Sequence, residues 1–183
     1  MTEGAVFQWA VVTGASLTAC VCDLQTRRIP NALTVPVFAA GLVQGLWTAG
    51  ASGLAQAVGV SLVLAIPFIL LFVFGHGGAG DAKLMGAVGA WLGLEQGIIV
   101  LCSVLAAGVV LAFATAIVRK RLKIVLVSIF LTVYGFLVTL FAEKKLRLRE
   151  PEPAVDKADR LTIPYGVAVF AGVCIGGVII WLW

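Results

Sequence analysis

The stretch "FVFGHGGAGDAKLMGAVGAWLG", residues 72–93, places an aspartate on a run of glycines between two hydrophobic segments. A carboxylate at membrane depth is costly, and such residues usually face a protein interior or a water-filled cavity. Glycines permit backbone conformations that other residues avoid, and they let another chain come close. We therefore expect Asp81 to present its carboxylate at a place where something else must approach.

The composition indicates an integral membrane protein. The chain has 183 residues, of which 61% are hydrophobic and 12% charged, and its mean hydropathy is +1.09. A soluble domain is roughly half apolar and a quarter charged. The net charge of +4 comes from basic runs beside hydrophobic segments, which is the pattern that orients spans in a bilayer. We therefore expect membrane lipid around the protein and no nucleic acid as a partner.

The hydrophobic segments predict an all-α polytopic bundle that forms a single domain over residues 1–183. A helix crosses the bilayer core with about 20 apolar residues. Segments that fit or approach this length are 5–22, 32–49, 53–74, 82–94, 96–118, 124–141 and 161–183. The segment 82–94 is short for a full crossing. We expect about six transmembrane helices, with 124–141 as one further hydrophobic segment of uncertain type.

Basic residues predict the orientation of the chain. Arg27 and Arg28 place the first loop in the cytoplasm, so the N-terminus is expected outside. Segment 124–141 has basic residues on both flanks, so it either spans the membrane or lies at its interface. The second alternative keeps the basic loop 143–160 in the cytoplasm, and we favour it for that reason.

Two of the nine acidic residues stand apart from the others. Asp23 and Asp81 each lie at the boundary of a hydrophobic segment, and both fall on the predicted cytoplasmic side. Two carboxylates close together in a site of low dielectric cannot both ionise easily, and they share a proton over a broad pH range. Such a pair can activate water for attack on a carbonyl. The only histidine, His76, has no evident serine or cysteine partner for a nucleophilic triad.

Other interpretations of the two aspartates stay open from the residues alone. Asp81 precedes a helix and could cap it, whereas Asp23 follows a helix at the end that the helix dipole makes unfavourable for an anion. A small proton-coupled transporter or channel could use both aspartates as a relay. The cysteines lack the paired spacing of a zinc site, so we expect no metal and no cofactor.

Three motifs resemble the type IV prepilin peptidase family, which consists of membrane aspartic proteases with a GxGD motif. They are "DLQTRRIPN" (23–31), "GAGDAKL" (78–84) and "IPYGVAVFAG" (163–172). The motifs occur in the family's order, and the resemblance covers most of the chain. The chain is most similar to the short peptidases of tight-adherence (Flp) pilus systems.

The resemblance implies a role for each matching residue. Asp23 and Asp81 would be the catalytic pair that activates water. Residues expected in the active-site loop are Gly78, Gly80 and Lys83, and those expected near the substrate are Pro30, Asn31, Pro164, Tyr165 and Gly166.

The resemblance also implies an activity and a location. Members of the family cut the short basic leader from type IV prepilin-like precursors at a glycine, on the cytoplasmic side of the bacterial inner membrane. Larger members carry an N-terminal insertion with two C-x-x-C pairs and also methylate the new N-terminus. This chain has no such pairs, so we expect peptidase activity without methyltransferase activity. The oligomeric state and the particular prepilin are left open.

Overall fold

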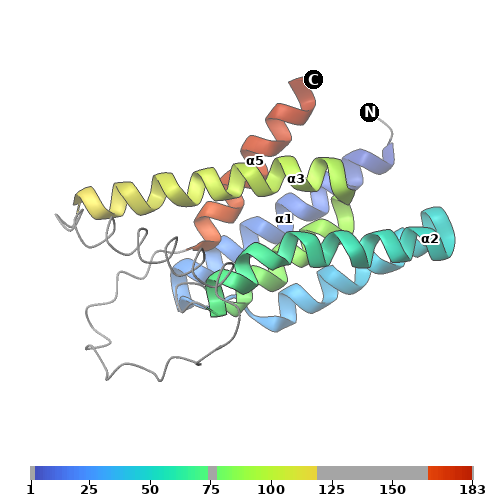
Figure 1. Cartoon of the computed structure of the whole chain (residues 1–183), viewed down its shortest axis with the longest axis horizontal. Coiled ribbons are helices and arrows are strands. Elements are labelled where there is room, and N and C mark those ends of the chain that lie inside the picture. The colour runs from blue at the N-terminus through green and yellow to red at the C-terminus, as the bar shows by residue number, and fades with distance from the viewer. Residues whose placement is uncertain (1–2, 74–77, 119–164, 183) are drawn as a thin grey trace, which may run out of the picture. The chain divides into compact units, whose positions relative to one another are not determined.

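The computed structural model describes residues 3–73, 78–118 and 165–182, and these residues are helical almost throughout (Figure 1). The helices are α1 (Glu3–Thr26), α2 (Asn31–Val73), α3 (Ala79–Val118) and α5 (Tyr165–Leu182). Each of these 4 helices is long and apolar enough to cross a membrane. The all-α membrane class predicted from the sequence is therefore confirmed, whereas the number of six crossings stays a prediction.

Two of the helices are interrupted where the sequence predicts a loop. In α2 the break lies at Ala49 and Gly50, and in α3 it lies at Gly93. Gly50 has φ 63° and Gly93 has φ 70°. Residues other than glycine rarely adopt such positive φ values. Each long helix therefore consists of two helical segments, and the breaks lie close to the ends expected for segments 32–49 and 82–94.

A backbone hydrogen bond from Arg27 closes the end of α1. This residue has φ 53°, and its N–H donates to the carbonyl oxygen of Asp23 at 2.9 Å. A left-handed residue just after a helix closes its last turn in this way, although glycine is the usual choice. The chain then turns through Pro30, whose carbonyl oxygen accepts from the N–H groups of Leu33 and Thr34 in the first turn of α2.

Residue contacts divide the chain into two compact units. Residues 1–110 and 164–183 form one unit, which we call the main unit, and residues 111–163 form the other. All the contacts analysed below lie within the main unit. The prediction of a single domain over 1–183 stays a prediction, and segment 124–141 lies outside the described residues.

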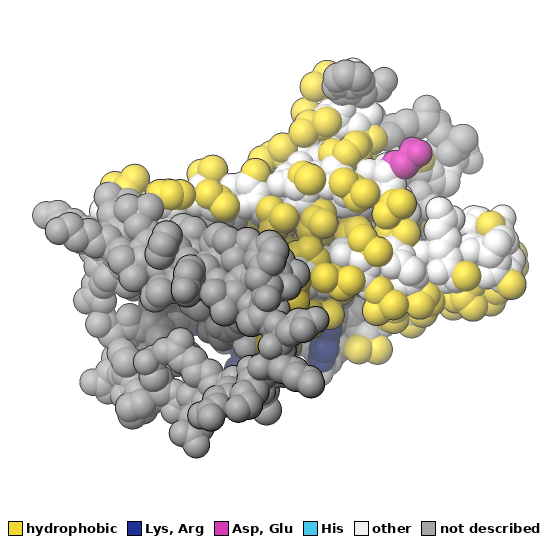
Figure 2. Space-filling view, in the orientation of Figure 1, with side chains coloured by type: hydrophobic (Ala, Val, Ile, Leu, Met, Phe, Trp, Pro, Cys, Tyr) yellow, Lys and Arg dark blue, Asp and Glu magenta, His cyan; other side chains and the backbone are white. Residues whose placement is uncertain are grey.

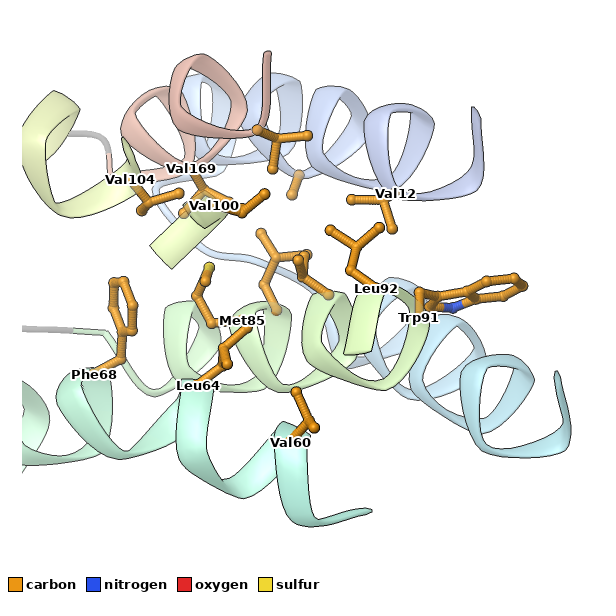
Figure 3. Packing of buried hydrophobic residues seen from close by; sticks show 14 of the residues in the cluster. Val12, Val60, Leu64, Phe68, Met85, Trp91, Leu92, Val100, Val104 and Val169 are labelled. Carbon is orange, nitrogen blue, oxygen red and sulfur yellow. The ribbon is translucent and has the colours of Figure 1, made fainter. Parts of the chain in front are cut away.

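The first segment of α3 lies at the centre of the main unit. Every residue from Leu84 to Leu92 is buried. Figure 3 shows Met85, Trp91 and Leu92 packed among apolar side chains from the other helices. A helix that is hydrophobic on all sides is expected inside a bundle. Its central position explains how a segment this short is accommodated, because other helices surround it.

Glycines permit the close packing of these helices. A Cβ atom added at Gly53 would collide with the carbonyl oxygen of Gly45, and one added at Gly89 would lie 3.0 Å from the carbonyl oxygen of Val60. Small residues at helix interfaces let backbones approach closely, as is common in membrane proteins. Large apolar side chains cover much of the outer surface of the described residues (Figure 2), which suits contact with lipid.

Candidate functional site

Asp23 lies in the last turn of α1 and is almost fully buried, with 8% of its surface exposed. Its Oδ2 atom accepts a hydrogen bond of 2.8 Å from the backbone N–H of Gly166, at the start of α5. The C-terminal end of a helix disfavours an anion, whereas the N-terminal end of another helix favours it. The structure therefore supplies what the sequence did not reveal: the first turn of α5 stabilises the carboxylate at this position.

Asp81 lies in the first turn of α3 and is 7% exposed. Its Oδ2 accepts from the N–H of Gly78 at 3.3 Å, and its own N–H donates to the carbonyl oxygen of Gly78 at 3.2 Å. This reciprocal pair closes the start of the helix much as a capping box does. Asp81 thus has a local structural role at the start of α3. Only its Oδ2 atom takes part in this role in the described part of the chain.

The structure brings Asp23 and Asp81 together in the main unit. Their carboxyl groups lie close enough for the charge of one to act on the other. The hydroxyl of Tyr165 likewise lies close enough to Asp81 for the charge of that carboxyl group to act on it. Three chain segments therefore converge, namely the end of α1 and the starts of α3 and α5.

A second set of contacts joins the loop after α1 and the first residue of α2 to the start of α3. Lys83 is exposed, and its Nζ donates to Oδ1 of Asn31 at 2.9 Å. A Cβ atom added at Gly80 would lie 3.0 Å from Cβ of Ile29, which precedes Pro30. Lys83 and Asn31 thus link the two polypeptide segments that carry Asp23 and Asp81.

Gly80 serves this site by its small size rather than by an unusual backbone conformation. Its φ is not in the left-handed region, and neither is that of Gly78. Of the two properties of glycine considered for this stretch, close approach of another segment applies at Gly80, and a conformation closed to other residues does not. What the position requires is room for Ile29, a contact partner that the sequence analysis did not identify.

A pocket between α2 and the start of α3 is lined by other residues than the carboxyl pair. It has a volume of about 460 Å³ and is lined by Thr34, Ser61 and apolar side chains of α2, and by Ala79, Ala82, Lys83 and Gly86 of α3. Neither Asp23 nor Asp81 is among its lining residues.

Two residues considered in the sequence analysis, His76 and Pro164, lie outside the described residues. Within the described ranges, no three His, Cys, Asp or Glu side chains gather as the ligands of a metal ion would.

Comparison with known proteins finds a family whose model matches more than half of the chain. The type IV leader peptidase family matches residues 10–113, which include Asp23 and Asp81. Prepilin leader peptidase/N-methyltransferases of Burkholderia pseudomallei strains 1026b and K96243 are each 35% identical to the chain over 99 residues, covering 51% of this chain and 32% of the relative. The chain thus matches about a third of the length of these relatives. No solved structure matches the chain.

Proposed function

Because the chain belongs to the type IV leader peptidase family, we propose that it is a membrane aspartic endopeptidase. Its substrates would be type IV prepilin-like precursors, each with a short basic leader followed by a hydrophobic helix. The observation that supports this proposal best is the convergence of two buried carboxyl groups, Asp23 and Asp81, from different helices.

In the proposed mechanism the two carboxyl groups share one proton and hold a water molecule between them. The ionised group accepts a proton from the water as its oxygen attacks the carbonyl carbon of the scissile peptide bond. The protonated group donates a hydrogen bond to the carbonyl oxygen and stabilises the charge that develops there. Each Oδ2 is already held by a backbone N–H, which leaves the Oδ1 atoms for the water and the substrate.

We further propose that only the leader is removed and that the new N-terminus is not methylated. The three motifs of the chain resemble those of the small peptidases of tight-adherence (Flp) pilus systems, whereas the relatives from Burkholderia pseudomallei carry both activities in their names.

The experiment that tests the function is cleavage of a precursor pilin by the purified protein in detergent. We expect two products, the leader and the mature pilin, with the cut after the glycine that precedes the hydrophobic helix. The matched control is the same precursor with that glycine replaced by a bulky residue. Equal cleavage of both precursors, or none of either by a folded protein, would contradict the proposed function.

The proposed orientation has the N-terminus outside and the carboxyl pair on the cytoplasmic side of the inner membrane. In a variant without native cysteines, Gln25→Cys should be labelled by a membrane-impermeant thiol reagent only from the cytoplasmic side, and Ser52→Cys only from outside. Both positions are exposed. Gln25 lies at the end of α1, and Ser52 lies just after the break in α2. The reverse pattern in sealed vesicles would show that the orientation is wrong.

A third cysteine, placed within 150–158, tests the sequence prediction for a region outside the described residues. We expect it to be labelled from the cytoplasmic side, because the loop 143–160 is basic. Labelling from outside would make 124–141 a membrane span, without affecting the assignment of Asp23 and Asp81.

The bond between Lys83 and Asn31 predicts a partial effect on cleavage. Lys83→Met and Asn31→Ala should each lower the cleavage rate by about 2- to 10-fold, because one hydrogen bond contributes about 0.5–1.5 kcal/mol. If the two side chains act through this bond, the double variant should be no slower than the slower single variant. Additive losses in initial rate would show that Lys83 acts independently of Asn31.

A proton-coupled transporter or channel remains the alternative function. A relay across the membrane would need ionisable groups at successive depths, whereas the two buried carboxyl groups of the described residues lie at one place. Proton flux into vesicles that contain the purified protein, lost in Asp81→Asn, would favour the relay.

A further inference from the structure

The N–H group of Gly166 makes a long-range contact with the carboxyl pair. Gly166 is the second residue of α5, so its N–H has no acceptor within that helix. It donates instead to Oδ2 of Asp23 at 2.8 Å, across 143 residues of sequence, and both residues are buried. A hydrogen bond from an N–H to a carboxylate is among the stronger ones in proteins.

The contact requires a glycine at this position for reasons of space. A Cβ atom at residue 166 would lie 2.8 Å from Cβ of Asp23, 3.1 Å from its Oδ2 and 3.2 Å from the carbonyl oxygen of Ala19. The backbone of α5 would have to move away from α1 to make room. That movement would lengthen the hydrogen bond and release the carboxylate from its present orientation.

We propose that Gly166 is a positioning residue whose backbone N–H orients Asp23 for catalysis. By holding Oδ2, it directs Oδ1, for which the described residues provide no hydrogen-bond partner, toward the water to be activated. The start of α5 thereby becomes part of the machinery of a site whose two carboxyl groups come from α1 and α3. This inference rests on the proposed peptidase function.

Comparison of two glycine variants of α5 tests the inference through kinetics. Gly166→Ala should lower kcat by about 10- to 100-fold, because a misplacement of about 1 Å can cost this much, and KM should change by less than about twofold. The control is Gly176→Ala, since a Cβ there would be crowded too, 3.0 Å from Cγ2 of Val100, but its three nearest neighbours are atoms of Val100 and not of Asp23. Equal loss of kcat in both variants, or a change confined to KM, would overturn the proposal.

A measurement that needs no substrate covers the case in which Gly166→Ala does not fold. In the ¹H–¹⁵N spectrum of the purified wild-type protein, the amide proton of Gly166 should resonate at low field because it binds a carboxylate. It should move upfield in Asp23→Asn and much less in Asp81→Asn. An unchanged resonance in Asp23→Asn would overturn the contact. An inactive wild-type protein would instead contradict the proposed function while the resonance still reports on the contact.

Discussion

Asp23→Asn and Asp81→Asn are each expected to lower precursor cleavage by about 10³-fold or more, to below detection. An amide can neither accept the proton of the attacking water nor complete the state with one shared proton. General acid–base groups typically contribute 10²- to 10⁴-fold each. The measurement is the initial rate of cleavage by purified variants in detergent. The double variant should be no slower than either single variant, because residues that act as one unit are strongly non-additive.

Both variants should remain folded, which separates a catalytic role from a structural one. The two carboxyl groups are buried, and removal of one of two neighbouring buried carboxyl groups also removes its desolvation cost. The thermal unfolding temperature should therefore stay equal to that of the wild type or rise. If Asp23→Asn cleaved its precursor at a near-normal rate, Asp23 and Asp81 would not form a pair, and the capping contact with Gly78 would be the role left for Asp81.

Gly172→Ala is expected to give the largest loss of stability among the glycine variants of α5. A Cβ atom there would collide with Cα of Val104 in α3, so the two backbones would have to separate. Overpacking of this kind costs about 1–3 kcal/mol, occasionally more. We expect a clear fall in the thermal unfolding temperature in detergent.

The control for this prediction is Gly14→Ala in α1. Gly14 is exposed, and a Cβ atom there would meet nothing within 4 Å. Alanine is favoured over glycine inside a helix by about 0.5–1 kcal/mol, so this variant should be neutral or slightly more stable. If Gly172→Ala were as stable as Gly14→Ala, the close packing of α5 on α3 would be absent from the protein in detergent.

The helical segments were predictable from the sequence because local patterns determine them. Runs of apolar residues define helices of membrane-spanning length, and small or polar residues around Gly50 and Gly93 mark the breaks, which the structure places at those glycines. The burial of Asp23 and Asp81 also agrees with the expectation that carboxylates within such a protein face its interior.

The contacts that complete the site could not be predicted in the same way. The bond from Gly166 to Asp23 joins residues 143 positions apart, and its donor is a backbone group that no side-chain pattern identifies. The sequence motif placed Gly166 near the site but gave no role for it. Ile29 lacks any chemical signal, because its contribution is a van der Waals contact with Gly80 that only the packing of the loop after α1 against the start of α3 creates.

The central claim is that water, activated by Asp23 and Asp81, attacks the scissile bond directly. The measurement is mass analysis of the released leader after cleavage by the purified protein in ¹⁸O-water that contains hydroxylamine. We predict a leader whose new C-terminal carboxyl carries one ¹⁸O atom, with no hydroxamate, because a direct attack by water leaves no acyl-enzyme for hydroxylamine to intercept. A leader that ends in a hydroxamate would reveal a covalent intermediate on a serine or cysteine and would contradict the account.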